Sequence, residues 1–128
     1  MTVGKSFTIT QLVEENMLAC NVGSGAVKVF ATPMMIALIE KCAAACIQDE
    51  LSEGEASVGT MVNVSHCAAT PLGMKVTATA VVTAVDGRKV SFNVKAEDEC
   101  GLIGEGTHER FVINVDKFNS KTAAKSAL

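Results

Sequence analysis

The longest apolar stretch of the chain predicts a buried helix. From Val29 to Leu51 nearly every position is apolar, and a helix that is apolar almost all round packs inside a protein. Thr32 is a good N-cap, and Pro33 suits the first helical position, where its missing N–H costs nothing. The polar turn at residues 52–54 ends in glycine. The pattern therefore predicts a helix that begins at Thr32 and stops near this turn.

One carboxylate interrupts the apolar surface of the predicted helix. The neighbours of Glu40 at helical spacing are Ile36, Ala37, Ala43 and Ala44. An isolated buried carboxylate is costly unless it is paired, hydrogen-bonded or protonated. Glu40 is therefore expected to have either a structural partner or a chemical role.

After the helix, the period of the pattern changes from helical to two, which is typical of strands. Alternation predicts strands over residues 58–68, 74–85, 88–98 and 102–115, with a weaker one over 7–13. Asp86-Gly87 is a strong hairpin signal. The prediction is an α+β domain in which one long central helix is followed by an antiparallel meander that curls round it.

Alternation also predicts which side chains face the helix. In the first of the four strands these are Val58, Thr60, Val62, Val64 and His66. The next two strands turn inward Val76, Ala78, Ala80, Val82 and Ala84, and then Val90, Phe92, Val94 and Ala96. In the last strand Gly104, Gly106, His108 and Arg110 share one face; its glycines indicate a bulge or a close backbone approach, and His108 is expected to be exposed.

Length and composition favour a single domain over residues 1–128. The segment 1–28 precedes the helix and contains the flexible sequence Gly23-Ser24-Gly25, so a mobile lid is expected over residues 20–29. The small, charged tail 119–128 is expected to fray. The mixed outer face and the free edges of such a sheet favour a two-fold homodimer.

Charge and cysteine content restrict the compartment and the partners. The net charge is −3 with scattered basic residues, which argues against nucleic-acid or membrane-surface binding. The first residues lack a signal-peptide pattern, and no apolar run is long enough to span a bilayer. Five cysteines without C-x-x-C spacing fit free thiols in the cytoplasm. Cys42 and Cys46 lie one turn apart, yet without further ligands they are expected to pack in the core, and no metal is expected.

Three side chains form a candidate catalytic site. Thr32 starts the helix, Glu40 lies roughly 12 Å further along its axis, and His66 is on the strand face that should pack on the helix. A hydroxyl, a carboxylate and an imidazole that converge on apolar surface can carry catalysis. Structural roles remain open at this point, because Thr32 can act as a cap alone, Glu40 can pair with His66, and His66 can be a core histidine.

Several short motifs, taken in order, resemble the hotdog-fold acyl-CoA thioesterases, in particular the fluoroacetyl-CoA thioesterase group. They are Phe30-Ala31-Thr32-Pro33 with Glu40 eight residues on, Val58-Gly59-Thr60 leading to His66, Ala69-Thr70-Pro71 with Gly73-Met74, Val85-Asp86-Gly87-Arg88, and the segment from Gly101 to Ile113, GLIGEGTHERFVI. Each motif alone is weak, but their order and spacing together are specific. The resemblance covers about residues 29–113.

The resemblance implies a hotdog fold, a homodimer with sites at the subunit interface, and hydrolysis of an acyl-CoA or related acyl-thioester. It assigns Thr32, Glu40 and His66 as the catalytic set and Gly59 and Arg110 to substrate binding. Fluoroacetyl selectivity in that group also involves aromatic side chains in the lid, whereas this chain has none between Phe7 and Phe30. The expected activity is thioester hydrolysis without a fluoroacetyl preference.

Thioester hydrolysis is chemically reasonable for these residues. A thiol has a pKa of about 8.5, so a thiolate leaves with little acid assistance. Glu40 can attack the carbonyl to give a mixed anhydride, or act as a base for water, and His66 can activate the hydrolytic water. No cofactor is implied. The alternatives are a hotdog enoyl-thioester hydratase or dehydratase, and a non-catalytic acyl-thioester binding module.

Overall fold

The computed structural model describes residues 1–127. It contains five strands: β1 (Ser6–Leu12), β2 (Glu55–His66), β3 (Lys75–Asp86), β4 (Lys89–Asp98) and β5 (Gly101–Asn114). The long helix α2 (Thr32–Gln48) is accompanied by the short helix α1 (Ala19–Val22), by α3 (Val115–Ala123), and by two 3₁₀ turns, η1 (Glu15–Met17) and η2 (Ala124–Ala127). All five predicted strands and the central helix are confirmed, with their ends shifted by a few residues.

The strands form one antiparallel sheet in the order β1-β3-β4-β5-β2. A meander was predicted for the four strands after the helix, and this is right only for β3, β4 and β5. β2 does not lie beside β3; it pairs with β5, while β1 takes the other side of β3. Alternation within a strand does not report which edge a strand joins, so the sequence pattern could not place β2.

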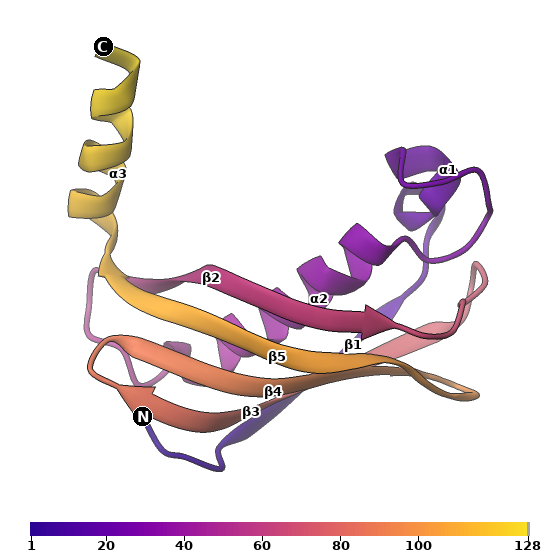
Figure 1. Cartoon of the computed structure of the whole chain (residues 1–128), viewed down its shortest axis with the longest axis horizontal. Helices are drawn as coiled ribbons and strands as arrows, with labels where there is room; N and C mark the ends of the chain where they lie inside the picture. Colours follow the sequence, from indigo (N-terminus) through magenta and orange to yellow (C-terminus); the bar gives the residue numbers. More distant parts are fainter. Residues whose placement is uncertain (128) are drawn as a thin grey trace.

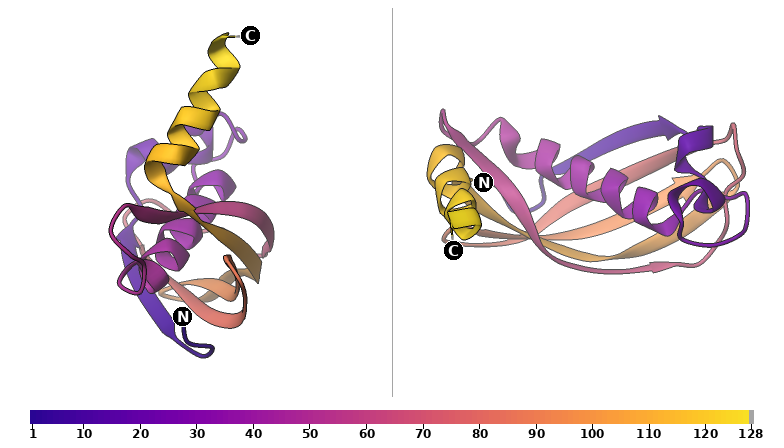
Figure 2. Two further views of the ribbon diagram at one scale, coloured as in Figure 1. Left: turned by 90° about the vertical axis from the view of Figure 1, so that its left-hand side faces the viewer. Right: turned by 90° about the horizontal axis from the view of Figure 1, so that it is seen from above.

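The sheet curls round α2, which lies along its concave face (Figures 1 and 2). The buried side of the helix packs into one apolar core with the inner faces of β3 and β4. Its buried residues are Met35, Leu38, Ile39, Cys42, Ala43, Cys46 and Ile47. The helix ends at Gln48, earlier than the turn at residues 52–54, because Asp49 already closes it as the C-cap. This α+β arrangement is the hotdog fold.

Cys42 and Cys46 contribute to this core as expected. The thiol of Cys42 donates to the carbonyl oxygen of Phe7 at 3.2 Å, and that of Cys46 lies 3.7 Å from the carbonyl oxygen of Lys5. Burial raises the pKa of the Cys42 thiol to about 11. Both thiols thus behave as small buried apolar groups that link α2 to β1.

A β-bulge in β2 overturns part of the predicted face assignment. The register with β5 shifts between Gly59 and Met61, so that Gly59 pairs with Arg110 while Val62 pairs with His108. Residues opposite each other in an antiparallel pair share a face. Val62, Val64 and His66 therefore face α2 as predicted, whereas Val58 and Thr60 do not, and Gly59 takes the inner position. The extra residue reverses the alternation within the strand.

The inner faces of the other strands follow the prediction closely. Val76, Ala78, Ala80 and Val82 are buried, as are all four predicted residues of β4. Ala84 is exposed instead, because the pairing of β3 with β4 shifts between Val82 and Ala84. The predicted close approach at Gly104 and Gly106 is confirmed: a Cβ at Gly106 would overlap the backbone of Asn63, and one at Gly104 would overlap the carbonyl of Ser65.

The C-terminal segment forms a helix where fraying was expected. α3 begins after Asn114, whose side chain accepts a hydrogen bond from the N–H of Lys117 at 3.0 Å. None of its residues is buried, so fraying of this helix stays a prediction; residue 128 lies outside the described residues. Within residues 1–127, no helix combines the length and apolar character that crossing a membrane requires.

Candidate active site

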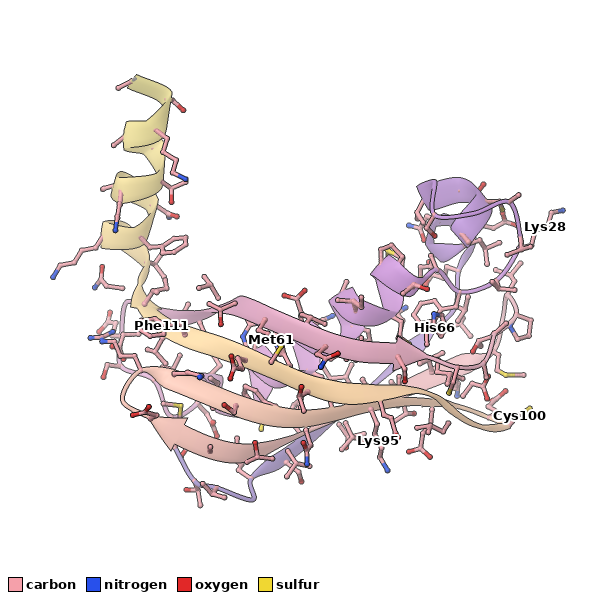
Figure 3. All side chains as sticks on the ribbon, viewed as in Figure 1. Lys28, Met61, His66, Lys95, Cys100 and Phe111 are labelled. Atoms are coloured by element: carbon pink, nitrogen blue, oxygen red, sulfur yellow. The ribbon has the colours of Figure 1, made fainter. Side chains whose placement is uncertain are left out.

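The first part of the candidate site lies at the N-terminal end of α2. The hydroxyl of Thr32 and Nδ1 of His66 are 2.7 Å apart, which is a short hydrogen bond. Thr32 was predicted to cap the helix, and this is wrong: Ala31 is the N-cap, and no side chain caps the helix there. Thr32 is the first helical residue, and its hydroxyl reaches across to His66, the last residue of β2. Figure 3 shows His66 at this end of β2, beside the start of α2.

The other ring nitrogen of His66 has a distinct environment. Nε2 is buried and has no hydrogen-bond partner among residues 1–127. Desolvation by burial lowers the pKa of the imidazole from its usual value, so the ring is neutral at neutral pH. A neutral imidazole with one nitrogen held by a hydroxyl and the other unpartnered is suited to exchange a proton with a small molecule.

His66 and Thr32 both line a pocket of about 290 Å³. The pocket lies between the start of α2, the segment before it and the loop after β2. Its other lining residues are Ala19, Ser24, Val27, Val29, Phe30, Ala31, Cys67, Ala68 and Ala69. Ala31 lines this pocket, while Ala37 lines a separate one beside β1. The pocket is large enough for a small acyl group or part of a longer chain.

The second part of the site surrounds Glu40. An oxygen of this carboxylate lies 3.6 Å from a terminal nitrogen of Arg110, with 40% of the Glu40 side chain exposed and only 8% of the arginine. A Cβ at Gly59 would stand 2.7 Å from the same carboxylate oxygen. The apolar surroundings expected for Glu40 are thus interrupted by an arginine, and its carboxylate occupies the place that a side chain at Gly59 would take. Arg110 and Gly59, the two residues assigned to substrate binding by resemblance, are paired across β5 and β2.

The guanidinium of Arg110 is fixed on its remaining sides. Its Nε donates to the hydroxyl of Ser57 at 2.8 Å, and a terminal nitrogen donates to the carbonyl oxygen of Ser57 at 2.8 Å. Burial lowers the pKa of this guanidinium, and the neighbouring Glu40 opposes that effect. The arginine remains charged because its pKa starts far above neutrality. Arg110 thus places a fixed positive charge beside the Glu40 carboxylate.

His108 is a site neighbour that the sequence pattern misplaced. It was expected to be exposed, but its side chain is fully buried between β2, β4 and α2. Its Nδ1 lies 2.7 Å from the carbonyl oxygen of Met61, and its Nε2 lies 3.2 Å from Arg110. The polar run around it misled the prediction, although its alternation with Arg110 correctly indicated the inner face. That alternation was the signal that could have found it.

The three predicted catalytic residues do not converge within one chain. Thr32 and His66 are in contact, whereas Glu40 lies two turns further along α2, roughly 12 Å away along the helix axis. Its polar neighbours are Gly59 and Arg110 instead of His66. The structural pairing of Glu40 with His66 that the sequence left open is thus absent between residues 1 and 127 of a single chain, which holds two separate groups of polar residues on the same inner face.

Comparison with known proteins identifies the family. The family model described as fluoroacetyl-CoA-specific thioesterase matches residues 13–116. The fluoroacetyl-CoA thioesterase of Streptantibioticus cattleyicolor is 46% identical over 99 residues, which cover 77% of this chain and 71% of that protein. The solved structure of the fluoroacetyl-CoA thioesterase FlK superposes with a TM-score of 0.93 at 39% identity and covers 98% of this chain and 97% of its own.

A more distant relative agrees with this result. A thioesterase superfamily member from Thermus thermophilus is 27% identical, with a TM-score of 0.90, and covers 98% of this chain and 93% of its own. The matched region contains Thr32, Glu40, Gly59, His66 and Arg110. The two groups of polar residues thus lie in a chain that belongs to the family of fluoroacetyl-CoA-specific thioesterases and is a thioester hydrolase.

Proposed function

We propose that this protein hydrolyses short acyl-CoA thioesters to a free acid and coenzyme A, at sites that two copies of the chain build together. The observation that carries the proposal is the division of the polar residues into two groups. Thr32 and His66 offer a proton acceptor beside a pocket, and Glu40, Gly59 and Arg110 offer a carboxylate beside a cation. Neither group alone contains a complete set for acyl transfer.

The position of the two groups along β2 supports a two-fold arrangement. β2 is the last strand of the sheet order, so its outer edge is free to pair with another strand. His66 lies four residues after Val62, and Gly59 lies three residues before it. Because the bulge makes Thr60 and Met61 share one ladder position, the midpoint between Gly59 and His66 on the ladder is Asn63. A two-fold axis near Asn63 would bring His66 of one chain opposite Gly59 of the other. Val62 is 37% exposed in the single chain, as expected for an apolar residue that a second chain would cover.

The ends of the molecule are compatible with this pairing. α1 and α3 project on the same side of the sheet, past β2, and lie at opposite ends of the strand (Figures 1 and 2). A second copy placed on β2 would sit between them. A dimer of this kind creates two equivalent sites, each with Thr32 and His66 from one chain and Glu40, Gly59 and Arg110 from its partner.

The residues then have complementary roles. Glu40 attacks the thioester carbonyl or removes a proton from water, and Arg110 together with a backbone N–H at the start of α2 stabilises negative charge on the carbonyl oxygen. When Nδ1 of His66 donates to Thr32, its Nε2 carries a free lone pair and can take a proton from the hydrolytic water. The hydroxyl of Thr32 can hold this tautomer, because it can accept a hydrogen bond from Nδ1. The absence of a side chain at Gly59 lets the Glu40 carboxylate lie close against β2, where a Cβ would stand only 2.7 Å from its oxygen.

Acetyl-CoA and similar short thioesters are the proposed substrates. A FlK variant, 38% identical to this chain with a TM-score of 0.93, has been solved in complex with acetyl-CoA. No aromatic side chain stands between Phe7 and Phe30, so we expect no strong preference for the fluorinated acyl group. Comparable kcat/KM for fluoroacetyl-CoA and acetyl-CoA is the expected result, and a large ratio in favour of fluoroacetyl-CoA would contradict it. The five free cysteines support a reducing compartment such as the cytoplasm.

Complementation between inactive variants tests the proposal. Glu40→Gln and His66→Ala chains should each release almost no thiol from acetyl-CoA. After the two are unfolded together and refolded, mixed dimers would contain one site with neither substitution, and part of the activity should return. The control is each variant refolded alone. If mixing restores nothing although mixed dimers form, the site is not shared between chains; if the native protein cleaves no acyl-CoA, the hydrolysis proposal is wrong.

A further inference from the structure

The buried imidazole of His108 has two polar contacts that the proposed reaction does not use. We propose that His108 is a positioning residue: in its neutral form it accepts a hydrogen bond from Arg110 and thereby aims the guanidinium at the carboxylate of Glu40. This role rests on the proposed function, because it concerns the same site. His108 is not among the residues that line the pocket at Thr32, so its proposed role is exerted through Arg110.

The contacts of His108 determine where its proton resides. The carbonyl oxygen of Met61, 2.7 Å from Nδ1, can only accept a hydrogen bond, so Nδ1 must carry the hydrogen. The guanidinium of Arg110, 3.2 Å from Nε2, can only donate, so Nε2 must offer its lone pair. Both requirements are met by a single form, the neutral imidazole with its hydrogen on Nδ1. An imidazolium would place an N–H against a guanidinium.

The surroundings of the ring favour this neutral form. His108 is fully buried, and Phe92 of β4 stacks on it with ring centroids 6.0 Å apart and an interplanar angle of 26°. Burial is the main cause that lowers the pKa of the imidazole, and the charge of Arg110 adds to it, while the contact with Met61 and the charges of Glu40 and Glu109 oppose it. The stacking and the Met61 contact also fix the plane of the ring, so the lone pair of Nε2 points in one direction.

The contacts of Arg110 explain why the direction of the Nε2 lone pair matters for Glu40. Ser57 binds two of the three guanidinium nitrogens. The third, Nη1, is the one that faces both His108 at 3.2 Å and Glu40 at 3.6 Å. Nη1 carries two hydrogens in a fixed plane. With one of them held by His108, the other is left for the Glu40 carboxylate or for a substrate oxygen beside it.

The tautomer can be measured without any assay of activity. Nitrogen-15 NMR of the native protein at neutral pH distinguishes a protonated imidazole nitrogen from one with a free lone pair. For His108 we expect a protonated Nδ1 and an unprotonated Nε2, with assignment by loss of the signals in His108→Phe. An imidazolium, or a hydrogen on Nε2, would overturn the proposal whether or not the protein hydrolyses thioesters.

Two amide substitutions separate the two contacts. In His108→Gln an amide oxygen can occupy about the place of Nε2 and accept from Arg110, whereas in His108→Asn an amide N–H can replace only the contact with Met61. We expect Gln to keep kcat for acetyl-CoA within about tenfold, and Asn to lose about 100-fold, the size of effect that a small misplacement of a catalytic group produces. KM should change little, because the arginine acts on the reacting centre.

Thermal melts of both variants separate positioning from folding. Rates are compared per folded molecule at a temperature well below both midpoints. If His108→Gln and His108→Asn lose kcat equally while both remain folded, the acceptor facing Arg110 is irrelevant and the proposal fails. If the native protein hydrolyses no acyl-CoA, the proposed function fails instead, and the NMR result still decides whether His108 holds Arg110 as a neutral acceptor.

Discussion

Glu40 is the side chain on which the proposed reaction depends most directly. Replacing it with Gln keeps its shape and removes its charge, and Gln can neither attack a thioester nor accept a proton. We expect Glu40→Gln to lower kcat by orders of magnitude. Stability should change by less than about 1 kcal/mol, because the Glu40 side chain is 40% exposed and solvent screens its pairing with Arg110.

A thermal melt and a thiol-release assay on one preparation test this expectation. A role of Glu40 that is only structural would give the opposite pattern, with a lower melting temperature and nearly full activity per folded molecule. That result would remove Glu40 from the mechanism.

Two glycines on the same inner face should respond differently to alanine. At Gly59 the new methyl group would meet the end of the Glu40 side chain, which can move, so the fold should persist while the carboxylate is displaced and activity falls. At Gly106 the methyl group would overlap the backbone of Asn63, which cannot move without breaking β2 pairing. We expect Gly106→Ala to cost roughly 3 kcal/mol or more.

Chemical denaturation of the two alanine variants, beside the same activity assay, provides the comparison. Equal losses of stability at the two positions would show that glycine is required at position 59 for packing alone.

The two histidines predict how stability depends on pH. Both have pKa values below the usual 6.5 in the folded protein, mainly through burial. The unfolded chain therefore binds protons more readily as the pH falls through about 6.5, and the folded state loses stability there. We expect the melting temperature to be flat above about pH 7 and to fall towards pH 5.

His108→Phe offers the control for this pH effect, since it removes one of the two titrating groups and retains an aromatic ring beside Phe92. Its melting temperature should fall less steeply over the same range. A melting temperature that rises on acidification to pH 5 would contradict the sign derived from the two pKa shifts.

At the scale of single residues, the sequence indicated which side chains are chemically unusual, but it did not indicate which groups they contact. Glu40 and His66 were singled out because a carboxylate within an apolar helix and a histidine on an inner strand face are visible from periodicity, and the catalytic roles of Thr32, Glu40 and His66 stay a prediction. The partner of each was not visible. Thr32 bonds His66 instead of capping α2, since the backbone of Ala31 already occupies the N-cap position.

At the scale of elements, the segment before α2 is the part most suited to move. It is fastened at its two ends, by bridges between Leu18 and Phe30 and between Val29 and Pro71. Between these bridges the chain is mostly exposed and passes through Gly23, whose φ of +85° needs glycine. Ser24 and Val27 line the pocket. These features support the mobile lid expected over residues 20–29, which stays a prediction.

Hydrogen exchange measures this motion. Amides of residues 21–28 should exchange far faster than those of α2, and a non-hydrolysable acyl-CoA analogue should slow them. Protection in the free protein equal to that of α2 would rule out a mobile lid.

The positions of strands were predictable and their connections were not. Alternation reports the two faces of a strand and is silent on its neighbours, so it found β2 and β3 but implied that they pair. It also assumes an unbroken period of two. The register shifts in β2 and β3 break that period, which is why Val58, Thr60 and Ala84 were assigned to the wrong face.

At the scale of the whole molecule, the proposed activity requires two chains. We expect light scattering to give the mass of a dimer at micromolar concentration. Replacing Val62 with Lys, at the exposed centre of the free edge, should place two like charges near the two-fold axis and weaken the dimer. Activity per chain should then fall as the protein is diluted, with the fold of each chain retained. A fully active monomer would contradict the shared site.

The bulge divides β2 into two halves whose inward-facing positions are shifted by one residue relative to each other. Before it, Ser57 and Gly59 point inward at odd positions; after it, Val62, Val64 and His66 point inward at even ones. Thr60 is the extra residue that shifts the alternation between the two halves. Deleting Thr60 alone would join the Gly59–Arg110 pair directly to the Met61–Glu109 pair, so both halves of the strand would keep their inward faces. Deleting Met61 as well would turn the first half over and point Val58, in place of Gly59, towards Glu40. The second deletion would therefore act like a frameshift in the folded chain, erasing one half of each site and sparing the other.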